Sequence, residues 1–150
     1  MARYLPLLLG FALAAPGMAA HALIVINQPW LKPAAAGLST EAFMNITATE
    51  GATLVAARTD SAVAVTIHAP GGARTVAKIA LPAGKVVGLA PGGYRLTLHG
   101  LDRDVRLGDI VPLTLTIRNP DGGLQSIPVR AVARWRSPLD DERRAHEHRH

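Results

Sequence analysis

Six histidines are the residues of this sequence whose side chains are best suited to bind a metal ion. Imidazole nitrogens are good ligands for Cu(II), Zn(II) and Ni(II). His68 and His99 lie in the middle of the chain, each at or near the end of an apolar stretch. His21 would offer an amine and an imidazole to one metal ion if it became the N-terminal residue. The other three alternate at the C-terminal end of the chain: His146, His148 and His150.

The C-terminal histidines lie in a charged segment, residues 136–150, which we expect to be a mobile tail. Alternating imidazoles in a flexible tail can chelate Cu(II), Zn(II) or Ni(II). The tail is therefore consistent with metal acquisition or metal buffering. A basic, solvated tail that binds no metal is the alternative interpretation.

Cysteine is absent, which excludes several classes of chemistry. The chain cannot form a disulfide, a thiolate metal site, an iron–sulfur cluster or the diacylglyceryl-cysteine of a lipoprotein. We also expect no enzyme, because no serine lies in a G-x-S-x-G motif and no lysine follows the glycine pairs as in a phosphate-binding loop. The formal charge is +5, but only 4% of residues are aromatic and the basic residues are scattered, so we expect no nucleic-acid binding.

Residues 1–20 have the layout of a secretory signal peptide, with a positive charge, an apolar run over 5–15 and small residues at the end. The run is too short to be a permanent membrane-spanning helix. We therefore predict export to the periplasm, with cleavage near Ala20 or Ala22 and no stable membrane span afterwards. Cleavage after Ala20 would leave His21 at the N-terminus.

The following residues, 21–135, predict one all-β domain. Turn residues rich in proline and glycine separate nine short apolar stretches, and the alternation expected of strands is visible in several of them. This spacing is typical of a β-sandwich or a Greek-key barrel. No stretch has helical periodicity over a dozen residues. The predicted strands are residues 23–27, 40–48, 53–58, 61–67, 74–81, 85–89, 93–99, 110–118 and 125–135.

Several motifs within residues 23–132 resemble the PCuAC family of periplasmic copper chaperones. They are PWLKPA at 29–34, FMNI at 43–46, LPAG at 81–84, LAPGGY at 89–94, GL at 100–101 and LGDIVPLTL at 107–115. The resemblance implies a cupredoxin-like Greek-key β-sandwich. It also implies copper binding, with a copper-accepting oxidase or another periplasmic metallochaperone as partner.

The copper ligands implied by the resemblance are mostly replaced in this sequence. His68 matches the first histidine of the family motif, whereas Ala73, Arg95 and Thr97 stand where a methionine, a histidine and a second methionine are expected. Cu(I) is a soft ion that thioethers and thiolates bind best. After the predicted cleavage the chain retains one methionine, Met44, at a predicted core position. A guanidinium at position 95 would in addition repel a cation.

His99 offers a replacement ligand, because residues 95, 97 and 99 share one face of a strand. Together with His68 it would suit Cu(II) or Zn(II) better than Cu(I). The alternatives are that His68 is an ordinary loop histidine and His99 a polar residue near a strand end. The sequence thus leaves two functions open. One is an exported copper chaperone-like protein with a His-based site, which the tail histidines and the His68/His99 pairing favour. The other is a metal-free binding or accessory module on the same fold.

Overall fold

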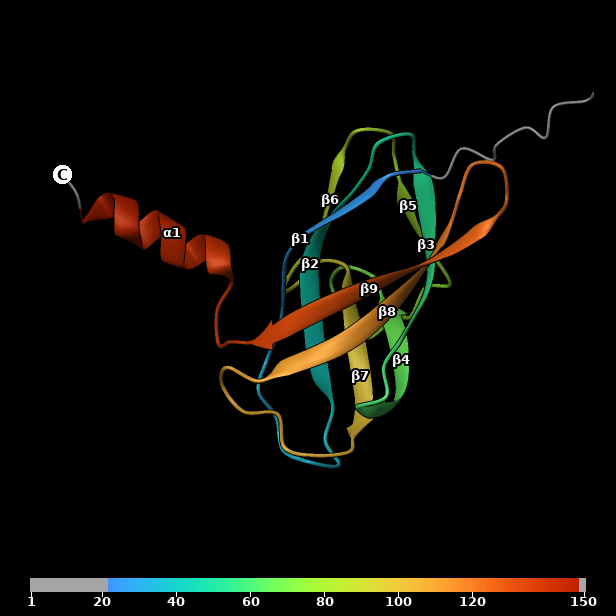
Figure 1. Cartoon of the computed structure of the whole chain (residues 1–150). Coiled ribbons are helices and arrows are strands. Elements are labelled where there is room, and N and C mark those ends of the chain that lie inside the picture. The colour runs from blue at the N-terminus through green and yellow to red at the C-terminus, as the bar shows by residue number, and fades with distance from the viewer. Residues whose placement is uncertain (1–21, 149–150) are drawn as a thin grey trace, which may run out of the picture.

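A computed structural model describes residues 22–148 as nine strands followed by one helix (Figure 1). The predicted all-β class and the predicted number of strands are confirmed. The elements are β1 (Ile24–Leu31), β2 (Thr40–Ala48), β3 (Ala52–Arg58), β4 (Ala62–His68), β5 (Ile79–Leu81), β6 (Val86–Leu89), β7 (Arg95–Leu101), β8 (Ile110–Arg118), β9 (Leu124–Ala133) and α1 (Pro138–Glu147).

The strands form one strongly curled sheet with the order β4-β7-β2-β1-β9-β8-β3-β5, and β6 pairs with β2 outside this path (Figure 1). Because side chains alternate along a strand, each strand directs every second residue inward. These inward residues form a single, mainly aliphatic core, as the low aromatic content predicts. Its fully buried members include Leu54, Leu96, Leu98, Leu115 and Ile117.

Strand β1 joins the two halves of the sheet. It pairs antiparallel with β2 on one side and parallel with β9 on the other. The sequence predicted that this strand would end before Gln28-Pro29, but the structure continues it to Leu31. The strand continues past the proline through a β-bulge. The register with β2 shifts between Asn27 and Trp30, and Gln28 adopts a φ of 50°.

The other strands agree with the predicted ranges to different degrees. β2 and β8 match residue for residue, whereas the stretch predicted at 74–81 forms a strand only over Ile79–Leu81. The first part of that stretch instead lies against β4, where the backbone N–H of Val76 donates to the carbonyl of Ile67 at 2.9 Å. The glycines after Pro70 allow this segment to turn back on β4 before it continues to β5.

Part of the predicted tail, Pro138–Glu147, forms helix α1, which the sequence analysis did not predict. The Ser137 hydroxyl caps the helix by accepting from the backbone N–H of Leu139, and a proline occupies the first turn. Asp140 and Asp141 lie in the same turn, where their negative charges interact favourably with the positive end of the helix dipole. These signals are present in the sequence, but the helix has no buried residue and therefore no apolar stripe that would predict it.

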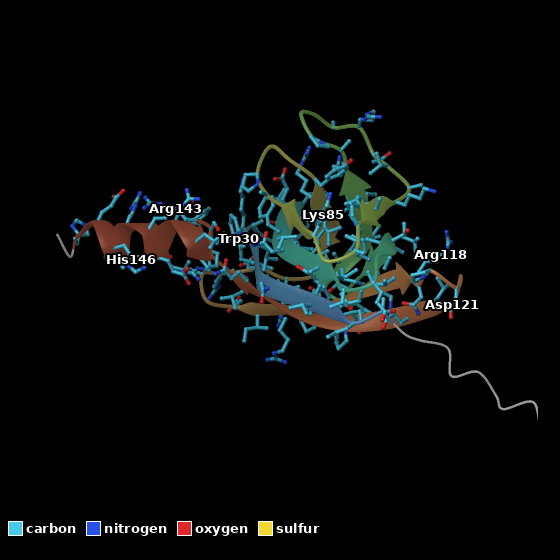
Figure 2. The ribbon with its side chains drawn as sticks, turned by 90° about the horizontal axis from the view of Figure 1, so that it is seen from above. Trp30, Lys85, Arg118, Asp121, Arg143 and His146 are labelled. Carbon is cyan, nitrogen blue, oxygen red and sulfur yellow. The ribbon has the colours of Figure 1, made fainter. Side chains whose placement is uncertain are left out.

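Helix α1 projects from the side of the sandwich (Figures 1 and 2). Its base is attached by an ion pair between Arg134 and Asp141 and by a 3.5 Å hydrogen bond from Gln28 Nε2 to Glu142 Oε1. Leu139 lines a small cavity of about 70 Å³ together with Trp30. Within the part of the chain that the structure describes, no helix is both long and apolar enough to cross a membrane.

Candidate metal site on strands β4 and β7

Strands β4 and β7 bring the predicted central site residues onto one face of the sheet. Directly opposed residues of an antiparallel pair share a face. The neighbouring residues Leu96 and Leu98 point the other way and are fully buried in the core. His68 and His99 therefore lie on the same face, as predicted. The opposed pairs are His68 with Arg95, Thr66 with Thr97, and Ala64 with His99.

The hydroxyl of Thr66 connects the two imidazoles. Thr66 Oγ1 lies 2.9 Å from His68 Nε2 and 2.7 Å from His99 Nε2. The ring centroids are 6.4 Å apart and the rings are tilted by 41°. The two histidines are thus brought together through one shared hydrogen-bonding group.

The two imidazoles differ in their contact with solvent. His68 is only 9% exposed, whereas His99 is half-buried. The Nδ1 atom of His68 is buried and makes no hydrogen bond within residues 22–148. Buried polar atoms nearly always have a partner, so this nitrogen is an unusual feature of the site.

Arg95 occupies the space beside His68 with a fixed positive charge. Its Nη1 donates to the carbonyls of Ala69 (3.1 Å) and Gly93 (3.2 Å), and its Nη2 donates to the carbonyl of Gly72. Its Nε lies 3.4 Å from Glu41 Oε1, and its side chain is only 12% exposed. Arg95 therefore links the loop after β4, the turn before β7 and strand β2.

Glu41 is the carboxylate that pairs with this arginine, and its negative charge is balanced by two neighbouring cations. It lies opposite Thr97 on β2, so it shares the site face. Besides Arg95 it contacts Lys32, whose Nζ lies 3.9 Å from Glu41 Oε2. A carboxylate between two cations is a poor ligand for a third, because the approaching metal ion would meet both positive charges.

The remaining positions implied by the PCuAC resemblance provide no soft ligand. Ala73 is exposed on the loop after β4, and Thr97 is a half-buried hydroxyl on β7. Met44 is 2% exposed in the core and pairs with Leu89 of β6. Among residues 22–148, no three His, Cys, Asp or Glu side chains are grouped as a metal site would require.

Two of the three tail histidines lie at the C-terminal end of helix α1, which projects away from the sandwich (Figure 1). His146 is in the last turn and His148 is the C-cap residue. Both are exposed, and Figure 2 shows His146 on the projecting helix. His150 and His21 lie outside the described residues, as does the predicted signal peptide. The structure thus separates the candidate ligands into a central pair and a helical group.

Two participants in the central site were not predicted from the sequence, Thr66 and Glu41. Strand alternation could have indicated Thr66, since residues 66 and 68 must share a face of β4. Glu41 could not have been found in this way, because it reaches the site through the pairing of β2 with β7. That pairing joins strands that are not consecutive in the chain.

Solved structures with a similar fold include PCuAC domains. The apo PCuAC domain from PmoF1 has a TM-score of 0.61 at 21% identity, covering 77% of this chain and 98% of that chain. The copper-bound PCuAC domain from PmoF2 has a TM-score of 0.59 at 23% identity, covering 77% and 100%. The solution structure of CuI-DR1885 from Deinococcus radiodurans has a TM-score of 0.56 at 26% identity, covering 78% and 83%. These similarities confirm the cupredoxin-like fold.

The family comparison agrees with the structural one. A search of curated proteins finds no match. A family model described as "Putative lipoprotein LpqE-like" matches residues 24–129, which is most of the chain. A lipoprotein anchor needs a cysteine, and this sequence contains none. The extent of the match and the shared fold show that the chain belongs to the LpqE-like family and is a member of the PCuAC type.

Proposed function

We propose that this protein is an exported, non-enzymatic copper chaperone-like protein whose metal site is built from imidazoles instead of thioethers. The central group is His68 and His99, and the second group is His146, His148 and His150. Such ligands suit Cu(II) or Zn(II) better than Cu(I). Its partner would be a copper-accepting oxidase or another periplasmic metallochaperone.

The observation that supports this proposal most directly is the meeting of His68 and His99 at Thr66. Two imidazoles from different strands lie within hydrogen-bond distance of one hydroxyl oxygen, at 2.9 and 2.7 Å. The fold on which they lie is that of domains that bind copper in relatives, as in PmoF2 and DR1885. Arg95 argues against a Cu(I) site of the usual kind, because it occupies a ligand position with a charge.

A metal-free accessory module is the second candidate function, and the contacts of Arg95 favour it. Its guanidinium joins three carbonyls and a carboxylate, and so forms cross-links of the kind that a metal ion would form. In this interpretation the sandwich would bind a partner protein without carrying a metal ion. The two candidates differ in whether the central histidines bind metal at all.

The experiment compares metal binding by the wild-type chain with two full-length variants. Variant one carries His68→Ala and His99→Ala, and variant two carries His146→Ala, His148→Ala and His150→Ala. We expect each variant to lose one class of Cu(II) or Zn(II) site in isothermal titration and to retain the other. Substitution is preferable to deleting residues 140–150, because deletion also removes the Asp141 and Glu142 contacts.

Both classes of site should weaken as the pH falls, because protons compete with the metal ion for the imidazole nitrogens. His146 and His148 are exposed at the end of helix α1, where residues two apart do not face each other, so a metal ion there must first rearrange the helix end and the affinity should be the lower of the two. If variant two binds no metal, the sandwich is metal-free and the accessory function is correct. If neither variant loses binding, these five imidazoles are not the ligands and the metal proposal is wrong.

Within the same proposal we infer that the signal peptide is cleaved after Ala20. Ala22 is only 2% exposed, and its carbonyl accepts from the side chain of Gln125 at 3.0 Å. Cleavage after Ala22 would remove this buried residue. Mass spectrometry of the exported protein should therefore find His21 at the N-terminus. An N-terminus at Leu23 would contradict the inference.

A further inference from the structure

The Thr66 hydroxyl carries one proton, and this limits how the two histidines can be protonated. A hydroxyl has one proton to donate and can accept two hydrogen bonds. Within residues 22–148 the Thr66 hydroxyl has no hydrogen-bond partner other than the two Nε2 atoms, so it donates its proton to one of them and accepts from the other. When both imidazoles are neutral, one therefore carries its proton on Nε2 and the other on Nδ1. The two rings are coupled as opposite tautomers.

We propose that His68 is the Nε2–H tautomer, so that its buried Nδ1 presents a free electron pair, and that Thr66 and His99 fix this state. In this arrangement His68 Nε2–H donates to Thr66, and the Thr66 hydroxyl donates to His99 Nε2. The proton of His99 is then on Nδ1, in a residue that is half-buried and can reach solvent. His68 Nδ1 is the atom left without a partner.

The opposite arrangement is less favourable. It would place an N–H donor at the buried Nδ1 of His68, where no acceptor exists within the described chain, and buried N–H groups without acceptors are rare.

This inference rests on the proposed function and divides the roles within the central pair. His68 Nδ1 would be the metal-binding atom, because both Nε2 atoms are engaged by Thr66. Thr66 and His99 would be positioning residues, like the outer-shell groups that orient metal-binding histidines. Nδ1 is fully covered, so neighbouring atoms must move before a metal ion reaches it. Arg95 fixes the segment that directly follows His68, through the carbonyls of Ala69 and Gly72.

The tautomers can be measured in the metal-free protein by ¹⁵N NMR of the imidazole rings, at a pH of about 8 where ordinary imidazoles are neutral. The ¹⁵N chemical shift of a ring nitrogen that carries a proton differs strongly from that of a ring nitrogen with a free electron pair. We expect His68 to be protonated on Nε2 and His99 on Nδ1. Opposite assignments, or the same tautomer in both rings, would overturn the proposal. This result does not depend on whether the protein binds metal.

The division of roles is tested with Zn(II), in a full-length background where the three tail histidines are alanine. Thr66→Val removes the hydroxyl at similar volume and should weaken Zn(II) binding by about 10–100-fold, as should His99→Ala, whereas His68→Ala should abolish it. Thr66→Ser should restore both the affinity and the tautomers. If Thr66→Val leaves the affinity unchanged or raises it, His99 is an independent ligand and the proposal is wrong. If the background binds no Zn(II) but the tautomers are as expected, the proposed function fails and the hydrogen-bonded arrangement stands.

Discussion

Replacing Arg95 by methionine is expected to lower the free energy of unfolding by about 3 kcal/mol. The substitution keeps an unbranched side chain but removes the guanidinium. The carbonyls of Ala69, Gly72 and Gly93 then lose a charged donor, and Glu41 loses its closer cation. The value is at the lower end of the range for buried ion pairs, because Glu41 is 35% exposed and keeps Lys32 as a neighbour. Urea unfolding followed by circular dichroism measures the loss.

Arg106 provides the matched control for this stability experiment. It also pairs with a carboxylate, with Nη2 3.7 Å from Asp104 Oδ2, but its side chain is 79% exposed. Arg106→Met should therefore cost less than about 1 kcal/mol. Equal losses in the two variants would mean that the buried contacts of Arg95 stabilise the fold no more than an exposed ion pair does. The cross-linking role assigned to Arg95 would then be wrong.

Restoring the ligands of the PCuAC motif should raise the Cu(I) affinity by at least about a hundredfold, which corresponds to about 2.8 kcal/mol. The variant is Ala73→Met, Arg95→His, Thr97→Met, which adds two thioethers and an imidazole and removes a fixed charge. The wild-type chain should bind Cu(I) weakly, because these three positions provide no soft donor. Competition with a Cu(I)-specific chelator measures both affinities, in the background without tail histidines.

A second variant separates the effect of ligands from the effect of charge. Ala73→Met with Thr97→Met adds the thioethers but keeps Arg95, whose guanidinium is fixed in place by its carbonyl partners. This variant should gain little, because a cation would have to bind beside a positive charge. A large gain in this variant would show that Arg95 does not block the site. No gain in the triple variant would show that the loop after His68 no longer reaches the metal position.

The parts of the fold that were predictable from sequence are those governed by local pattern. β2 and β8 have regular alternation and clear turn residues at both ends, and their bounds were predicted without error. β1 was cut short because Gln28-Pro29 normally ends a strand, and a bulge that keeps the strand going depends on its partner β2. Helix α1 was missed because it buries nothing, so only its capping residues indicate it.

The candidate site shows the same division between local and long-range information. The shared face of residues 95, 97 and 99 follows from strand alternation, and the register of β4 with β7 then brings His68 onto it. The contacts that change the chemistry of the site come from elsewhere. The carboxylate that neutralises Arg95 comes from β2, and the carbonyls that Arg95 binds come from the loops after β4 and before β7. No spacing in the sequence indicates such contacts.

The parallel pairing of β1 with β9 has a consequence for how this chain reaches its folded state. The first strand lies between the second and the last, so its outer edge stays unpaired until the end of the domain is available. β8 also forms its longer pairing with β9, not with its other partner β3. Pairing between strands so distant in the chain makes folding slow and prevents its completion during synthesis. A product that stops before β9 lacks the partner of β1 on one side and the longest pairing of β8, so the sheet cannot be completed until the end of the domain has been synthesised.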